Sequence, residues 1–135
     1  MSKPRLLVVD DEEYIRFALR RWFENCGFEV DLAEDGDVAV AKCRTSSYDV
    51  ITMDLVMPRM NGQTAIRSIR SFNATVPIIV LTAYQERAGD LSSVGATRIL
   101  AKPLALHDLE DEVRRVLPAS AKRPPETASG PNRKS

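Results

Sequence analysis

The sequence predicts an α/β protein built on a doubly wound, five-stranded parallel sheet. Short apolar runs alternate five times with stretches in which apolar residues recur at helical spacing. Most of the short runs are apolar throughout, as expected for strands that are covered on both faces by helices. Together, these observations favour five strand–helix units in succession over separate helical and sheet layers.

The first two strands and the helix between them have distinct patterns. The first strand is the apolar run Leu6–Asp10, and a helix is predicted over Glu12–Asn25. Asp11 is expected to cap the start of that helix, and Gly27 is expected to end it. Phe28–Ala33 alternates apolar and acidic residues, which predicts a strand at the sheet edge with one face in water.

The remaining elements continue the same alternation. Gly95 is expected to end the helix that precedes it, and apolar residues from Leu106 to Val116 form one stripe along the last helix. The elements are a helix at Gly36–Thr45, a strand at Asp49–Asp54, a helix at Gly62–Phe72, a strand at Val76–Thr82, a weak helix at Gln85–Val94, a strand at Arg98–Ala101 and a helix at Leu104–Leu117.

Polar side chains follow or close four of the five apolar runs. Asp10 and Asp11 follow the first run, Asp54 the third, Thr82 the fourth and Lys102 the fifth. Right-handed crossovers place the carboxyl ends of parallel strands along one edge of the sheet. In the flavodoxin-like order 2-1-3-4-5, strands one and three flank the ligand-binding switch point. Other doubly wound orders also fit the pattern, but this order brings all five side chains together.

Each of these side chains also has an ordinary structural interpretation. An Asp pair before a helix is commonly a cap, Asp54 could be a turn residue, and Thr82 could be a simple strand residue. Lys102-Pro103 could simply begin a helix. Their shared position on different strands, with complementary charges, favours a joint site.

The chemistry of such a site follows from its charges. Three carboxylates at one edge repel one another unless a cation intervenes, and a divalent ion such as Mg²⁺ prefers oxygen ligands of this kind. Lys102 adds a compact positive charge on the opposite side. The site could therefore hold a phosphoryl group over Asp54, whose carboxylate would form an acyl phosphate as the nucleophile.

Composition argues against several classes of protein. Hydrophobic residues make up 44% of the chain, and 19 basic residues balance 19 acidic ones, so no net charge recruits nucleic acid or an anionic membrane. The apolar runs are far shorter than the roughly 20 residues that cross a bilayer, and the first is too short for a signal peptide. Cys26 and Cys43 lack metal or redox spacing. We therefore expect a cytoplasmic protein with two reduced thiols.

Four segments carry a resemblance to a known family. They are LLVVDDEE at Leu6–Glu13, MDLVMPRMNG at Met53–Gly62, VLTAY at Val80–Tyr84 and GATRILAKP at Gly95–Pro103. In this order they resemble the receiver domain of two-component response regulators. The resemblance implies a phosphoacceptor receiver domain over residues 1–117.

The resemblance assigns roles to the acidic residues. Asp54 would be the phosphoacceptor, taking its phosphoryl group from a phosphohistidine. Asp11 would bind Mg²⁺ directly and Asp10 mostly through water, with Asp54 and the backbone carbonyl of Val56 completing the protein ligands. Mn²⁺ is an alternative ion.

The resemblance also assigns roles around the phosphoryl group. Lys102 would pair with the phosphoryl oxygens, and the Lys102-Pro103 peptide would be cis. Pro58 and Gly62 would shape the loop after the acceptor. The Thr82 hydroxyl would move onto the phosphoryl group and so switch the surface made by the fourth helix, fifth strand and fifth helix.

Two positions bear on how that switch works. Ile99 stands where the family usually has Tyr or Phe, so the aromatic half of the usual coupling is in question. Tyr84 is either a partly exposed loop aromatic or a residue that limits the access of water to the acyl phosphate. The sequence does not decide between these two roles.

The resemblance implies a signalling switch, with at most slow autophosphatase activity, and not an enzyme. Its partner would be a sensor histidine kinase or a phosphotransfer protein, and a homodimer through the switch surface is compatible with it. Neither nucleic acid nor a membrane is expected to bind this segment directly.

Three other functions fit the sequence less well. The first is a receiver fold that acts as an unphosphorylated interaction module, for which the absent aromatic at Ile99 speaks. The second is an aspartyl-nucleophile phosphatase of the haloacid-dehalogenase type, which needs an acid two residues after the nucleophile, where this chain has Val56. A nucleotide-binding module lacks its glycine-rich motif after the first strand.

From Pro118 onward the helical and strand patterns stop. The segment 118–135 is rich in Pro, Ser and Ala and contains no run that could pack, so we expect a disordered tail or linker. Four cations, Lys122, Arg123, Arg133 and Lys134, are scattered through it. The chain is expected to be either a stand-alone regulator or part of a larger one.

Overall fold

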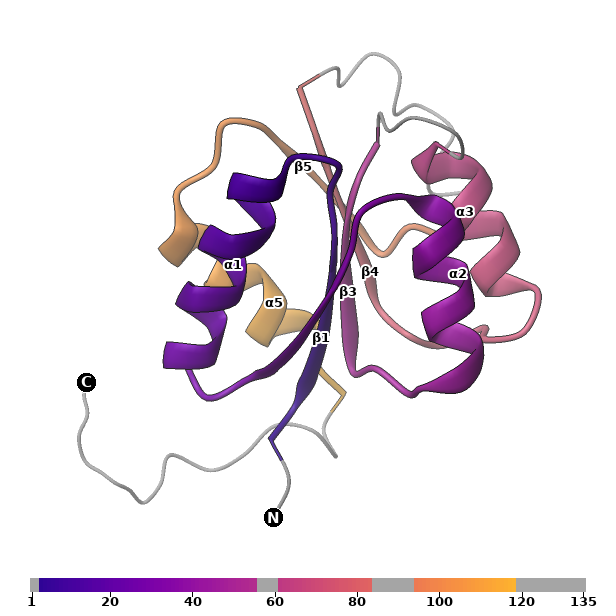
Figure 1. Ribbon diagram of the computed structural model, residues 1–135, viewed down its shortest axis with the longest axis horizontal. Helices are drawn as coiled ribbons and strands as arrows, with labels where there is room; N and C mark the ends of the chain where they lie inside the picture. Colours follow the sequence, from indigo (N-terminus) through magenta and orange to yellow (C-terminus); the bar gives the residue numbers. More distant parts are fainter. Residues whose placement is uncertain (1–2, 56–60, 84–93, 119–135) are drawn as a thin grey trace.

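A computed structural model of the chain describes residues 3–55, 61–83 and 94–118 (Figure 1). Nearly the whole of the predicted helix at Gln85–Val94 and of the predicted tail at 118–135 lies outside these residues. The elements are β1 (Arg5–Val9), α1 (Glu13–Asn25), β2 (Glu29–Ala33), α2 (Gly36–Thr45), β3 (Val50–Asp54), α3 (Gly62–Arg70), β4 (Ile78–Thr82), β5 (Arg98–Ala101) and α5 (Leu106–Val116).

The five strands form one parallel sheet in the order β2-β1-β3-β4-β5. This confirms the predicted fold class and strand order. β2 lies at an edge, as its alternating pattern predicted, and its first residue, Glu29, is exposed. The three inner strands are almost entirely buried, because each is paired on both sides and covered on both faces.

Helices cover both faces of the sheet and divide the core in two. α1 and α5 lie on one face and α2 and α3 on the other (Figure 1). Side chains alternate along each strand, so β1 sends Leu6 and Val8 into the core under α1 and α5, and Leu7 and Val9 into the other core. The sheet is therefore held from both sides, which fixes the positions of its strand ends.

The helix termini show which local signals the chain uses. Asp35 and Asn61 cap α2 and α3, because their side chains accept hydrogen bonds from backbone N–H groups in the first turn. The prediction that Asp11 caps α1 is wrong: the N-cap is Glu12, and it makes no side-chain cap hydrogen bond. Gly27 follows the end of α1 with a φ of 94°, a conformation that favours glycine.

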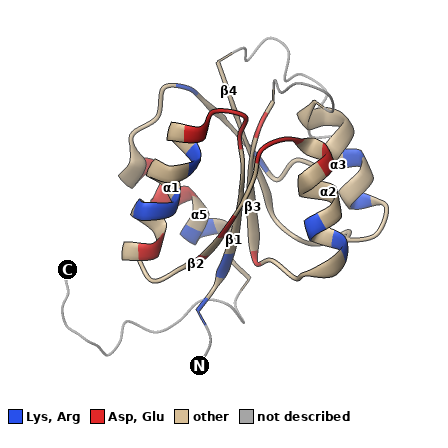
Figure 2. Cartoon of the chain, viewed as in Figure 1, with Lys and Arg blue, Asp and Glu red and all other residues tan. Residues whose placement is uncertain are grey.

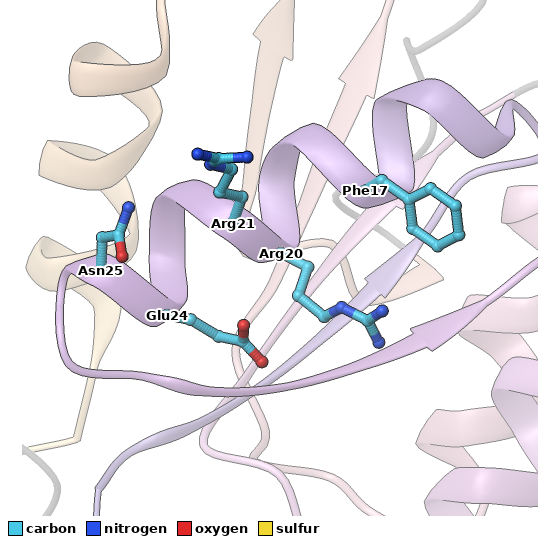
Figure 3. A pocket seen from close by; sticks show the side chains of 5 residues that line it. All are labelled: Phe17, Arg20, Arg21, Glu24 and Asn25. Carbon is cyan, nitrogen blue, oxygen red and sulfur yellow. The ribbon is translucent and has the colours of Figure 1, made fainter.

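Charged residues are unevenly distributed around the sheet. Acidic residues (red) gather at the edge where β1 ends (Figure 2). The outer face of α1 carries a shallow pocket lined by Phe17, Arg20, Arg21, Glu24 and Asn25 (Figure 3). Among the helices described, none has the length and apolar character needed to cross a bilayer.

Both cysteines are free thiols and half-buried. Burial is the main cause that raises the pKa of Cys26 to about 12 and the pKa of Cys43 to about 11. Because the thiolate is the reactive form, neither thiol is activated for redox chemistry or metal binding at neutral pH. This agrees with two structural cysteines.

Candidate functional site

The register of the sheet brings the predicted residues to one edge. Val9 is paired with Met53, so Asp10 and Asp54, the next residue in each case, lie at the same level. Asp54 is paired with Leu81, and Thr82 with Ala101. The polar residues at the ends of four neighbouring elements therefore follow one another across the carboxyl edge of the sheet.

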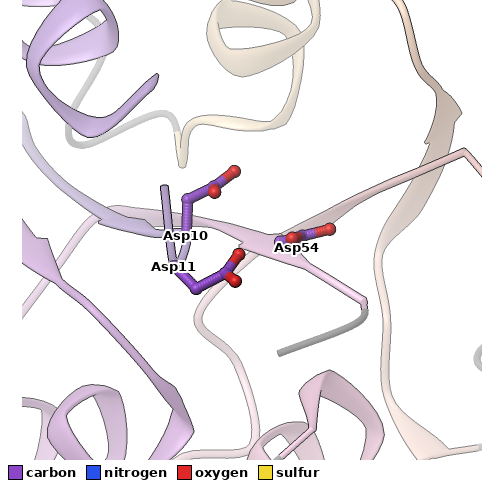
Figure 4. Close-up of side chains that lie close together, drawn as sticks. All are labelled: Asp10, Asp11 and Asp54. Atoms are coloured by element: carbon purple, nitrogen blue, oxygen red, sulfur yellow. The ribbon is translucent and has the colours of Figure 1, made fainter. Parts of the chain in front are cut away.

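Three carboxylates converge at this edge. Asp10 and Asp11 follow β1, and Asp54 ends β3; one carboxylate oxygen from each lies within 4.8 Å of the other two (Figure 4). Asp10 is buried, Asp54 is half-buried and Asp11 is exposed. The cluster is thus open to solvent on the Asp11 side and closed beneath Asp10.

Lys102 comes to the cluster from the end of β5. Its Nζ lies 3.5 Å from Oδ2 of Asp10 and 3.5 Å from Oδ1 of Asp54. Its backbone N–H donates to the carbonyl of Thr82 at 2.9 Å, which ties the lysine to the end of β4. The peptide between Lys102 and Pro103 is cis, as expected.

Burial and charge act together on Asp54. The pKa of Asp54 is raised to about 6, and burial is the largest cause; the attraction of Lys102 opposes this rise, whereas the repulsion of Asp10 and Asp11 adds to it. For Lys102, burial alone would lower the pKa, but the neighbouring Asp10 and Asp54 outweigh this and raise it. A single ammonium thus only partly offsets three crowded carboxylates.

A hard divalent cation fits this donor set. Asp10, Asp11 and Asp54 offer oxygen ligands on converging side chains, and the negative charges of Asp10 and Asp11 add to burial, the main cause, in raising the pKa of Asp54. Mg²⁺ binds to one or two carboxylates and keeps several of its waters, so an open cluster of this kind suits it. A soft, thiolate-preferring metal has no suitable ligand in the cluster.

Gly62 closes the loop after Asp54. Its N–H donates to the carbonyl of Leu55 at 2.9 Å, and α3 begins there. A Cβ atom at this position would lie 2.7 Å from the backbone oxygen of Asp54. Only glycine therefore lets the start of α3 approach the acceptor strand this closely.

The match with known proteins decides the family. Residues 6–114 match the family described as the response regulator receiver domain. The chain belongs to this family. Its members function as signalling switches in two-component systems, in line with the predicted class of function.

The receiver domain has close relatives among curated proteins. Response regulator MprA of Mycolicibacterium vanbaalenii is 39% identical over 116 residues, which are 84% of this chain and 50% of MprA. Transcriptional regulatory protein ResD of Bacillus subtilis is 38% identical over 118 residues, which are 86% of this chain and 49% of ResD. The chain thus spans about half the length of the curated relatives it matches.

Solved structures resemble the receiver domain along almost their whole length. The response regulator TrrA of Thermotoga maritima, in complex with Mg²⁺-BeF, has a TM-score of 0.78 and 36% identity, with 84% of this chain and 99% of that chain covered. Chemotaxis protein CheY4 of Vibrio cholerae has a TM-score of 0.80 and 34% identity, with 86% and 100% covered.

Not every predicted residue falls within the described part of the receiver domain. Val56, Pro58 and Tyr84 lie outside it, so their predicted roles stay predictions. Thr82 is at the site edge with a buried side chain. Ile99, on the edge strand β5, is paired with Val80 and packs against the core under α2 and α3.

Sequence reasoning missed one residue beside the site. Arg16, on the first turn of α1, donates from Nη1 to the backbone carbonyl of Asp10 at 2.7 Å. No signal in the sequence distinguishes Arg16 from the other arginines of α1, because the contact depends on how the chain turns between β1 and the helix. Spacing from Asp10 alone does not determine that turn.

Proposed function

We propose that this receiver domain accepts a phosphoryl group on Asp54 in a reaction that depends on Mg²⁺, or on Mn²⁺ in its place. The observation that carries the proposal is the convergence of three carboxylates and one ammonium at the carboxyl edge of the sheet. A nucleophile, a metal site and a counter-charge are the components that phosphoryl transfer to a carboxylate needs.

The three acidic residues have different roles in the proposed reaction. Asp54 presents a carboxylate oxygen as the nucleophile, and Asp10 and Asp11, with Asp54, hold the metal. Val56 would add its backbone carbonyl. The bound metal neutralises negative charge on the phosphoryl oxygens and on the carboxylates that surround them.

Lys102 and Thr82 come to the acceptor from the ends of β5 and β4. Lys102 is already within 3.5 Å of Asp54, so its ammonium is placed to pair with a phosphoryl oxygen. Thr82 supplies a hydroxyl one residue beyond the residue paired with Asp54. Its movement onto the phosphoryl group would switch the surface formed by the fourth helix, β5 and α5, with Ile99 in place of the usual aromatic.

The proposed donor is a phosphohistidine on a sensor histidine kinase or a phosphotransfer protein. Membership of the receiver family supports a partner of this class. The structure of TrrA in complex with Mg²⁺-BeF supports a divalent metal and a phosphoryl group as ligands of this receiver domain, because TrrA is 36% identical to this chain. We place the receiver domain at residues 1–117 and treat 118–135 as a tail or linker.

The direct test is labelling by a small phosphodonor. The wild-type protein should gain one phosphoryl group from acetyl phosphate in the presence of Mg²⁺, and Asp54→Asn should gain none, because an amide cannot form the acyl phosphate. Phosphorylation is followed by intact-protein mass spectrometry. Labelling that persists in Asp54→Asn would show that the acceptor is another residue, and an unlabelled wild type would favour an unphosphorylated interaction module.

A further inference from the structure

Asp10 is held at four separate atoms. Its N–H donates to the carbonyl of Ala33 at 3.1 Å, and its Oδ1 accepts from the N–H of Glu12 at 2.9 Å. Its Oδ2 faces Lys102. Its backbone carbonyl accepts the 2.7 Å hydrogen bond from Arg16, and because the donor is a charged guanidinium this is the kind of hydrogen bond that is short and strong.

Asp11 is held much less directly. It is exposed, and among the described residues no hydrogen bond holds its carboxylate. Its direction therefore depends on its backbone. The carbonyl of Asp10 and the N–H of Asp11 belong to one planar peptide group. A contact that fixes the Asp10 carbonyl thus also fixes the plane from which Asp11 projects.

We propose that Arg16 is a positioning residue of the metal site, which acts by holding the Asp10–Asp11 peptide so that the Asp11 carboxylate points toward Asp10 and Asp54. The proposal rests on the proposed function, since it assumes that these carboxylates bind a divalent ion. Groups that orient metal ligands typically change metal affinity about 10-fold to 100-fold when they are removed. Arg16 differs from most of them because it acts on the backbone and not on a ligand side chain.

The test compares Arg16→Gln with a matched control. Arg21→Gln removes the same charge from the same helix, and Arg21 is exposed on the pocket face of α1 (Figure 3). Isothermal titration with Mg²⁺ should show affinity about 10-fold or more weaker in Arg16→Gln than in the wild type, and unchanged in Arg21→Gln. Equal affinities in the two variants would overturn the proposal.

Two further readouts separate positioning from a purely structural role. In labelling with acetyl phosphate, Arg16→Gln should need more Mg²⁺ for half of its maximal rate, and should approach the wild-type rate when Mg²⁺ is saturating. The amide ¹⁵N resonance of Asp11 should move in metal-free Arg16→Gln and stay in place in Arg21→Gln. A lower rate at every Mg²⁺ concentration, or an unmoved Asp11 resonance, would contradict the positioning role.

Arg16→Lys keeps the proposal testable if Arg16→Gln does not fold. A lysine retains a charged donor group but lacks the planar, forked guanidinium. Its Mg²⁺ affinity should therefore be weaker than that of the wild type, and wild-type affinity in Arg16→Lys would contradict the inference. A wild-type protein that binds no Mg²⁺ would instead refute the proposed function itself, so the two failures are distinguishable.

Discussion

At the scale of single residues, the site owes its chemistry to an imbalance of charge. Asp10, Asp11 and Asp54 bring three negative charges within 4.8 Å, and Lys102 supplies one positive charge at 3.5 Å from two of them. The sheet holds these groups together because burial of the strands outweighs their repulsion. The resulting excess of negative charge is what a divalent cation would neutralise.

The raised pKa of Asp54 predicts a stability difference that depends on pH. The pKa of this carboxyl group rises from 3.8 to about 6 on folding, chiefly through burial, so the folded state binds the proton more tightly than the unfolded state. The metal-free protein therefore loses stability as the pH rises from 3.8 to about 6, and the cost is fully present above that range. Asp54→Asn removes this cost.

Asp54→Asn should consequently raise the free energy of unfolding at pH 7 by about 1–3 kcal/mol in EDTA. The gain should disappear as the pH falls through the window between the two pKa values. Urea denaturation at several pH values measures both quantities. A gain that does not change with pH would mean that charge at Asp54 is not its cause.

Lys102 has a role that can be separated from folding. Lys102→Ala should leave a folded domain that still binds Mg²⁺, but the changes in NMR shifts that phosphorylation causes away from the site should be severely weakened. Lys42→Ala is a control, because Lys42 donates to the backbone of Leu32 and does not contact the cluster. An equal response in Lys102→Ala and the wild type would remove Lys102 from the mechanism.

At the scale of elements, the junctions between strands and helices carry the site. The turn from β1 into α1 supplies Asp10 and Asp11 and is held by Arg16. The junction from β3 to α3 supplies Asp54 and is closed at Gly62, where the helix meets the acceptor strand. The position of Asp54 therefore depends on how closely α3 can approach.

Gly62→Ala tests this junction. The added Cβ would lie 2.7 Å from the Asp54 backbone oxygen, so α3 must shift; we expect a loss of about 1–3 kcal/mol in stability and slower labelling of Asp54. Gly27→Ala is the comparison, because it strains a positive φ but meets no atom within 4 Å. It should lower the stability measured by denaturation without changing the labelling rate; identical rates in both variants would argue against the role of Gly62.

Element boundaries show where sequence reasoning reached its limit. The helix at Gly36–Thr45 and the strand at Arg98–Ala101 were predicted to the residue, whereas β4 begins at Ile78 instead of Val76 and α5 at Leu106 instead of Leu104. Pro77 lies between the predicted and the observed start of β4, and Pro103 directly precedes the predicted start of α5. Apolar periodicity does not register that a proline lacks the backbone N–H.

At the scale of the whole molecule, the carboxyl and amino ends of the strands form two edges of the sheet with different roles. The carboxyl edge gathers the acidic cluster, whereas the amino edge is tied together by neutralising contacts around Arg5. Arg5 lies 3.3 Å from Asp31 and over the ring of Tyr48, and the Tyr48 hydroxyl donates to Asp31 at 2.7 Å. The contacts at the amino edge thus stabilise the sheet and leave the excess of negative charge at the carboxyl edge unchanged.

Tyr48→Phe should reveal this separation. Loss of the hydroxyl removes the hydrogen bond to Asp31 and should lower the free energy of unfolding by about 1 kcal/mol. Mg²⁺ affinity and the rate of labelling at Asp54 should not change, because the substitution is made at the opposite edge. Titration and urea denaturation of the same sample measure both, and a change in Mg²⁺ affinity would show that the two edges are coupled.

The fold and the convergence of the cluster were predictable from the sequence for one physical reason. Parallel strands joined by right-handed crossovers end at a common edge, so residues such as Asp54 and Lys102 could be placed together without coordinates. The cap of α1 and the contact of Arg16 could not, because both depend on the path of two or three residues after β1. The Asp10 carboxylate accepts the hydrogen bond from the N–H of Glu12 at the start of this turn. Asp11 therefore does not have the capping role that its position in the sequence predicted.

A crystal structure of the domain grown with Mg²⁺ and beryllofluoride, a phosphoryl mimic, tests the central claim most directly. We expect the metal to be bound by Asp11 and Asp54, with Asp10 at its side, and the beryllofluoride to be attached to the Asp54 carboxylate within reach of Lys102. A metal bound elsewhere, or beryllofluoride attached to another residue, would contradict the proposed site.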